Sequence, residues 1–158
     1  MITFERDNIK FNFRVAGILI HHDRVLLHTT LKDNFWSLPG GRAELNEDTG
    51  QTIVREFKEE LDLDVRIDRL GFIREDFFEY EGKQYHEIGF YYFISTMRVD
   101  EHITNISGNF NGKEDDGRLI FRWFPIESLK DVHVYPENLR SDLVELMKGN
   151  GLKHFINH

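Results

Sequence analysis

Three glutamates, Glu56, Glu59 and Glu60, occur close together in a stretch with the residue pattern of a helix. At about 100° per residue, carboxylates three and four positions apart share one side of a helix, within an arc of roughly 100°. Like charges at this spacing repel each other by roughly a few tenths of a kcal/mol per pair. Mg²⁺ takes oxygen ligands and is often shared between carboxylates and substrate phosphates. The cluster therefore predicts a site for a hard divalent cation, and the alternative is a solvated acidic helix face.

The boundaries of this helix are marked by its own residues. Asp48 and Gln51 have the spacing of a capping box, so we expect the helix to span residues 49–61. An apolar stripe on a separate side would pack on the core: Ile53, Val54, Phe57 and Leu61. Asp62 stands where helices often end in a left-handed backbone conformation, which Asp adopts at some cost.

The residues from Gly41 to Leu63 resemble the Nudix box. The order is glycine, five residues, glutamate, seven residues, then Arg-Glu-apolar-any-Glu-Glu-any-Gly-apolar, and Asp62 replaces the second glycine. The flanking segments 36–41 (Trp-Ser-Leu-Pro-Gly-Gly) and 123–125 (Trp-Phe-Pro) resemble the same family. The chain is therefore similar to a Nudix (MutT-like) hydrolase, and the resemblance implies an α/β/α sandwich.

The resemblance also implies roles for particular residues. It assigns ligands of Mg²⁺ or Mn²⁺ to the Gly40 carbonyl and to Glu56, Glu59 and Glu60. Three residues would support the site: Gly41, because a glycine lets the backbone approach closely, and Glu47 and Arg55, through an ion pair between loop and helix. An ordinary turn is the alternative for the two glycines.

The general base is not assigned by the box alone. Glu56 and Glu59 are candidates, and some family members use a glutamate on the loop before the late tryptophan segment. Glu114, nine residues before Trp123, resembles that element and would be either the base or a fourth ligand. Its alternative role is a solvated charge in an acidic run.

Two further residues are candidates for substrate contact. Tyr80 loosely resembles a downstream tyrosine of family members that act on dinucleoside polyphosphates. His86 lies in an expected strand that would line a pocket. Both belong to an aromatic-rich pair of strands, where one or two rings would stack on a base and the others would be core.

Composition limits the protein class. The chain has 158 residues, which suits one domain over 1–158, and no cysteine, which excludes disulfides, thiol catalysis and Cys-ligated zinc. A net charge of −8 argues against binding a nucleic-acid duplex. We find neither a membrane span nor a signal peptide, so we expect a cytoplasmic protein. Many Nudix relatives are dimers, but no sequence feature decides whether this chain forms a homodimer.

The remaining elements predict a mixed α/β sheet with helices on both faces. We expect strands over residues 15–20, 25–28, 65–78, 85–95 and 119–124, with tight turns after the first and third. A short helical turn is expected at 126–129 and a helix at 136–147, with Pro136 in its first turn. Residues 99–117 are expected to form a loop.

These features predict a metal-dependent hydrolase that cleaves the diphosphate linkage of a nucleoside diphosphate joined to another moiety, with water as nucleophile. ADP-ribose, a sugar nucleotide or a dinucleoside polyphosphate would fit. One alternative is a MutT-like nucleoside triphosphate pyrophosphohydrolase that cleans the nucleotide pool. The other is a non-catalytic nucleotide-sensing module, against which the three intact glutamates argue.

Overall fold

The computed structural model describes residues 1–98, 101–149 and 151–158. Within them the chain forms the strands β1 (Thr3–Arg6), β2 (Ile9–His21), β3 (Arg24–Thr29), β4 (Trp36–Ser37), β5 (Gly40–Arg42), β6 (Val65–Tyr80), β7 (Lys83–Thr96), β8 (Phe110–Asn111), β9 (Ile120–Pro125), β10 (Val134–Tyr135) and β11 (Lys153–Asn157). The helices are α1 (Thr49–Leu61), α2 (Glu101–Thr104) and α3 (Leu139–Met147), with 3₁₀ turns η1 (Asp115–Gly117) and η2 (Ile126–Asp131).

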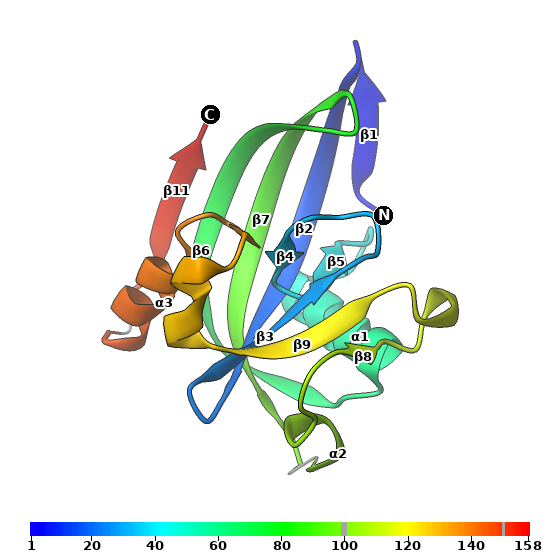
Figure 1. Ribbon diagram of the computed structural model, residues 1–158. Coiled ribbons are helices and arrows are strands. Elements are labelled where there is room, and N and C mark those ends of the chain that lie inside the picture. Colours follow the sequence, from blue (N-terminus) through cyan, green and yellow to red (C-terminus); the bar gives the residue numbers. More distant parts are fainter. Residues whose placement is uncertain (99–100, 150) are drawn as a thin grey trace.

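The sheet is mixed, and β2 is its centre. The strand order is β10-β4-β3-β2-β7-β6-β11, with β1 and β5 also paired to β2 (Figure 1). β2 pairs in parallel with β7 and antiparallel with β3, and β6 pairs antiparallel with β7. The turn between β6 and β7 has positive φ at Glu81 and Gly82, and that between β2 and β3 at His22 and Asp23. Two consecutive positive φ angles suit a two-residue hairpin, as the tight turns of the sequence predict.

Alternation along β2 separates the core into two parts. Val15 and Leu19 pack in a cluster with Phe57 of α1, whereas Ala16 and Ile18 pack in a second cluster with Leu143 of α3. Successive side chains of a strand point to opposite faces, so the two helices cover opposite faces of the sheet. Figure 1 shows α1 beside β2 and β5, and α3 beside β6 and β11. The predicted mixed α/β architecture with helices on both faces is confirmed.

Several boundaries differ from the sequence-based expectation. The last helix begins at Leu139 rather than near residue 136, because Pro136 directly follows β10 and the residue before a proline favours extended backbone. β2 begins at Ile9, in a stretch of alternating apolar and polar residues, and β11 was not predicted. The expected loop at 99–117 contains α2, β8 and η1, while residues 99–100 lie outside the described part.

No helix within the described residues is long and apolar enough to cross a membrane.

Candidate active site

The helix α1 is capped at both ends as its sequence predicts. The Asp48 carboxylate accepts the Gln51 backbone N–H at 2.8 Å, and the Gln51 side chain accepts the Asp48 N–H at 2.9 Å. Asp62 has φ 53° and ψ 35°, the left-handed conformation. Its carboxylate pairs with Lys58 at 2.9 Å and with Lys113 at 3.3 Å, and these hydrogen bonds lower the pKa of Asp62. The charge that replaces the box glycine is therefore neutralised by two lysines.

Arg55 joins the loop before α1 to the helix. Its Nε donates to Glu47 Oε2 at 2.9 Å and its Nη2 to Glu47 Oε1 at 3.0 Å, so the pair is bidentate. The same guanidinium contacts Glu56 at 2.9 Å and Glu59 at 3.2 Å through Nη1. The hydrogen bonds from Arg55 lower the pKa of Glu47 to about 2. The ion pair implied by the resemblance is thus present, and one cation orients three carboxylates.

The two glycines of the loop are required by close backbone approach. Gly40 and Gly41 form β5 and pair with Ala16 and Val15 of β2. A Cβ on Gly40 would overlap the carbonyl oxygen of Val15, and a Cβ on Gly41 would overlap the Glu56 carboxylate. Only a residue without a side chain leaves room there. The loop backbone therefore lies directly against the helical glutamates.

Four carboxylates gather beside this loop. Glu60 is only 5% exposed, and burial, with the charges of Glu56 and Glu114, raises its pKa to about 8. Partial burial and the charges of Glu59 and Glu56 raise the pKa of Glu114. Lys113 brings this last residue into place, because its N–H donates to the Glu60 carbonyl at 2.7 Å. Long-range backbone pairing thus brings Glu114 to the helical glutamates.

The residues present suit a divalent cation. Glu60 Oε2 is buried and has no hydrogen-bond partner, which is costly for an anionic oxygen unless a cation meets it. Within the described residues no three histidine, aspartate or glutamate side chains are placed so that together they could already hold a metal ion. The side chains of Glu56 and Glu59 are instead held by Arg55. Oxygen-rich surroundings of this kind suit Mg²⁺ or Mn²⁺ and not a site of soft ligands.

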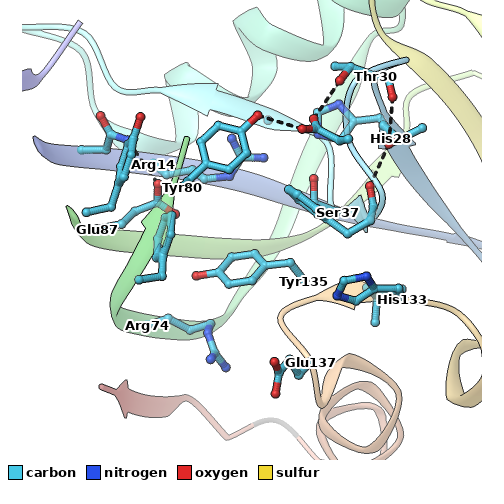
Figure 2. Close-up of a pocket in the computed structure, with 18 of the residues that line it drawn as sticks. Arg14, His28, Thr30, Ser37, Arg74, Tyr80, Glu87, His133, Tyr135 and Glu137 are labelled. Carbon is cyan, nitrogen blue, oxygen red and sulfur yellow. Dashed lines mark hydrogen bonds between the residues drawn. The ribbon is translucent and has the colours of Figure 1, made fainter. Parts of the chain in front are cut away.

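A cavity of about 860 Å³, part of whose lining is drawn in Figure 2, borders Glu60. Gly40, Arg42 and Glu60 line it, so three residues of the box region face this space. Tyr80 also lines it, and its hydroxyl donates to Asp33 Oδ1 at 2.7 Å. Burial, with this hydrogen bond, raises the pKa of Tyr80 to about 12. Tyr80 therefore holds the β6–β7 hairpin against the loop that follows β3.

His86 does not line this cavity. Its neighbours Tyr85 and Glu87 line the cavity, and alternation along β7 turns His86 to the other face of the sheet. There its ring stacks on Phe77 with centroids 4.5 Å apart and meets the Phe11 ring at 5.4 Å. The sequence showed the strand but not which of its faces borders the cavity.

The cavity floor holds residues that the sequence-based interpretation missed. They lie in three cross-strand rows of β2, β7 and β6, of which all members but Asp76 and Gly89 line the cavity: Lys10, Tyr85 and Phe78; then Asn12, Glu87 and Asp76; then Arg14, Gly89 and Arg74. The only available signal was the alternation of Lys10, Asn12 and Arg14 with apolar residues, which is typical of a strand. The pairing of these strands could not be inferred from that pattern.

The sequence matches the family described as NUDIX domain over residues 11–144. This chain belongs to the Nudix family of diphosphohydrolases. No curated protein matches the sequence. The fold is similar to that of a UDP-X diphosphatase, with TM-score 0.60 and 17% identity, covering 91% of this chain and 66% of the other.

Two other solved structures are similar in fold. An ADP-ribose pyrophosphatase from Streptococcus suis has TM-score 0.59 and 17% identity, covering 92% of this chain and 98% of the other. A mutator MutT protein from Bacillus halodurans has TM-score 0.61 and 19% identity, covering 93% and 90%. At these identities the likeness establishes the Nudix fold and leaves the substrate open.

Proposed function

We propose that this Nudix protein hydrolyses the diphosphate linkage of a nucleoside diphosphate joined to a second moiety, with a divalent metal ion. The main support is the buried Glu60 carboxylate, whose free oxygen lies among other carboxylates beside a cavity of about 860 Å³. That volume is near the upper end of ligand pockets, which run from about 300 to 1,000 Å³. Such a space suits two moieties joined by a diphosphate.

The box residues would hold the metal. The Gly40 carbonyl and the carboxylates of Glu56, Glu59 and Glu60 are the proposed ligands of Mg²⁺ or Mn²⁺. When bound, the ion supplies charge for the phosphate oxygens and lowers the pKa of a coordinated water. Gly41 leaves room for Glu56, and Glu47 orients Arg55, which holds Glu56 and Glu59.

The general base would be one of three carboxylates at the metal site, Glu56, Glu59 or Glu114. The charges of Glu56 and Glu59 act on Glu114. The raised pKa of Glu114 favours a group that accepts a proton from water near neutral pH. Its 3₁₀ turn is held to α1 by Lys113. A fourth metal ligand is the other role open to Glu114.

Two arginines would hold the diphosphate between the metal ligands and the cavity. Arg14 and Arg42 are cross-strand partners on β2 and β5, and both line the cavity. Arg14 Nη2 donates to the Leu38 carbonyl at 2.8 Å, which anchors the guanidinium beside the glycine loop. A guanidinium is well suited to phosphate oxygens because its donors form a planar fork.

We also propose that the domain extends over residues 1–158. The family match ends at residues 11 and 144. Beyond them, β1 pairs with β2 and β11 pairs with β6, so both segments belong to the same sheet.

The test is a product-resolved turnover screen with Mg²⁺ and then Mn²⁺, with chelator as control. The panel contains ADP-ribose, sugar nucleotides, dinucleoside polyphosphates, and normal and oxidised nucleoside triphosphates. We expect cleavage of a linked diphosphate into two phosphorylated products, with kcat/KM above about 10⁴ M⁻¹s⁻¹. Preference for a triphosphate with release of pyrophosphate would instead indicate the MutT-like activity. Ligand binding without turnover would indicate a sensing module.

A further inference from the structure

The middle row of the cavity floor contains three buried polar side chains on adjacent strands. Asn12 of β2, Glu87 of β7 and Asp76 of β6 are register partners and are 5%, 6% and 2% exposed. Asp76 is fully paired, because Arg74 donates to its two oxygens at 3.2 Å each. Asn12, Glu87 and Arg74 line the cavity, and the Arg74–Asp76 pair closes the row on the β6 side.

Glu87 is the member of this row with unmet hydrogen-bonding capacity. Within the described residues its one hydrogen bond comes from Asn12 Nδ2 to Oε2, at a long 3.4 Å. Arg14, whose charge acts on Glu87, donates through Nη2 to the Leu38 carbonyl and forms no ion pair with Glu87 among the described residues. Burial raises the pKa of Glu87, and the charge of Arg14 opposes that shift. A carboxylate can accept up to about four hydrogen bonds, so this group is poorly satisfied by the protein itself.

A second unsatisfied group lies in the same part of the cavity. The hydroxyl of Tyr135 on β10 is buried without a hydrogen-bond partner. Burial first, then the charge of Tyr91, a weak interaction of the hydroxyl with Asp76 and the charge of Glu87 raise the pKa of Tyr135, so the phenol lies beside the carboxylate row. Figure 2 shows Glu87, Tyr135 and Arg74 at one end of the cavity and His28, Thr30 and Ser37 at the other. Buried polar atoms without partners are uncommon, and a ligand is one reason for them.

We propose that Glu87 determines substrate specificity by accepting hydrogen bonds from two adjacent donors on an organic moiety of the substrate, with Tyr135 beside it as a third contact. This inference builds on the proposed function, since it names the chemistry of the group attached to the diphosphate. A neutral donor pair of this kind occurs on the ring N–H and amino group of guanine, and on neighbouring hydroxyls of a sugar. Both sources present two donors at the spacing of the two carboxylate oxygens.

The test compares matched ligands that differ by one donor. A guanine nucleotide sugar is compared with its hypoxanthine counterpart, which lacks the amino group. UDP-glucose is compared with UDP-3-deoxyglucose, in which no two neighbouring ring carbons of the hexose both carry a hydroxyl. For each pair we measure kcat/KM with Mg²⁺ and the rise in Tm that the ligand produces, because a Tm shift reports binding without turnover.

In the wild-type protein we expect the complete donor pair to be preferred by about 10–100-fold in one of the two series, which identifies the source. Glu87→Gln keeps the shape but replaces one acceptor by a donor, so that preference should disappear. Tyr135→Phe should weaken it to a smaller extent. Glu79→Gln is the control, because Glu79 is exposed at the rim of the same cavity.

The Tm without ligand separates specificity from a structural role. Glu87→Gln removes a poorly satisfied buried carboxylate and should leave this Tm unchanged or higher. An unchanged ligand preference in Glu87→Gln, or no preference in the wild-type protein by either measurement, overturns the inference. A preference seen in Tm shifts but with no hydrolysis contradicts the proposed function and leaves the specificity role supported.

Discussion

Glu60 on α1 and Glu87 on β7 are equally buried carboxylates, at 5% and 6% exposure, but their neighbours differ. Glu60 lies among other carboxylates, and the charges of Glu56 and Glu114 act against its ionisation. Glu87 lies beside the Asn12 amide and near the Arg14 guanidinium. The Arg14 charge favours ionisation of both residues, but Glu60 faces two carboxylates, whereas the one carboxylate that acts on Glu87, Asp76, is paired with Arg74. The first arrangement suits a cation and the second suits neutral donors. This difference supports the proposed metal site at Glu60 and the proposed recognition of an organic moiety at Glu87.

The largest loss of activity is expected when a carboxylate is removed from the proposed metal site. Glu59→Gln should lower metal-dependent turnover by about 10³-fold or more, because metal stabilisation of the transition state is worth several kcal/mol. The Glu59 side chain is 43% exposed, so Tm should not change. Steady-state kinetics and thermal unfolding check this result, with Glu127→Gln, at an exposed glutamate of η2, as control. Wild-type rates in Glu59→Gln would remove Glu59 from the metal ligands.

The next test concerns how the helical glutamates are oriented. Arg55→Lys should lower kcat by about 10–100-fold, as is usual for residues that orient metal ligands. A lysine cannot reproduce the fork that contacts Glu47, Glu56 and Glu59 together. The apparent Kd for Mn²⁺, measured by titration, should rise in parallel. Lys58→Arg on the same helix is the control, and equal losses in both variants would show a general helix effect.

The pH dependence of the Tm tests whether Glu60 is protonated in the metal-free protein. The pKa of Glu60 in the fold, about 8, lies above its ordinary value of 4.5. Between these pH values the folded protein keeps a proton that the unfolded chain releases, so this residue lowers the free energy of unfolding as pH rises. Without metal, Glu60→Gln should therefore exceed the wild-type Tm by about 5–10 °C at pH 8 and match it at pH 4.5.

Bound metal should reverse the difference in Tm between the wild-type protein and Glu60→Gln at pH 8. A bound divalent cation favours the ionised carboxylate, so Mg²⁺ should stabilise the wild-type protein more at pH 8 than at pH 5. Glu60→Gln should show little of this dependence. Thermal unfolding at several pH values, with Mg²⁺ or chelator, checks both expectations. A pH-independent difference between the two proteins would mean that Glu60 is ionised without metal.

The smallest effect is expected at the rim of the cavity. Tyr80→Phe removes the 2.7 Å hydrogen bond to Asp33 and keeps the ring, so KM should rise by about threefold or less. Tyr80→Leu should raise KM further if the ring contacts a base, since stacking is worth about 1–3 kcal/mol per base in single-strand binders. Equal KM values in both variants would limit Tyr80 to its hydrogen bond with the loop.

The sequence predicted the box helix and its caps well because their information is local. The Asp48 cap, the left-handed Asp62 and the spacing of Glu56, Glu59 and Glu60 depend on residues within one or two helical turns. The Arg55–Glu47 pair could be expected from the family resemblance. Glu114 was a weaker prediction, because its position depends on the Lys113–Glu60 backbone hydrogen bond between distant segments.

The cavity floor could not be predicted because it depends on strand pairing. Asn12, Glu87 and Asp76 meet only through the parallel pairing of β2 with β7 and the register of β6. A shift of one residue would turn each side chain to the other face, and along β7 Glu87 lines the cavity whereas the adjacent His86 does not. The sequence alone determined the Nudix box helix, its caps and its carboxylates, because helical neighbours are neighbours in the chain. Only the tertiary structure decided which strand faces and which distant loop complete the site, because those contacts depend on register and packing across the sheet.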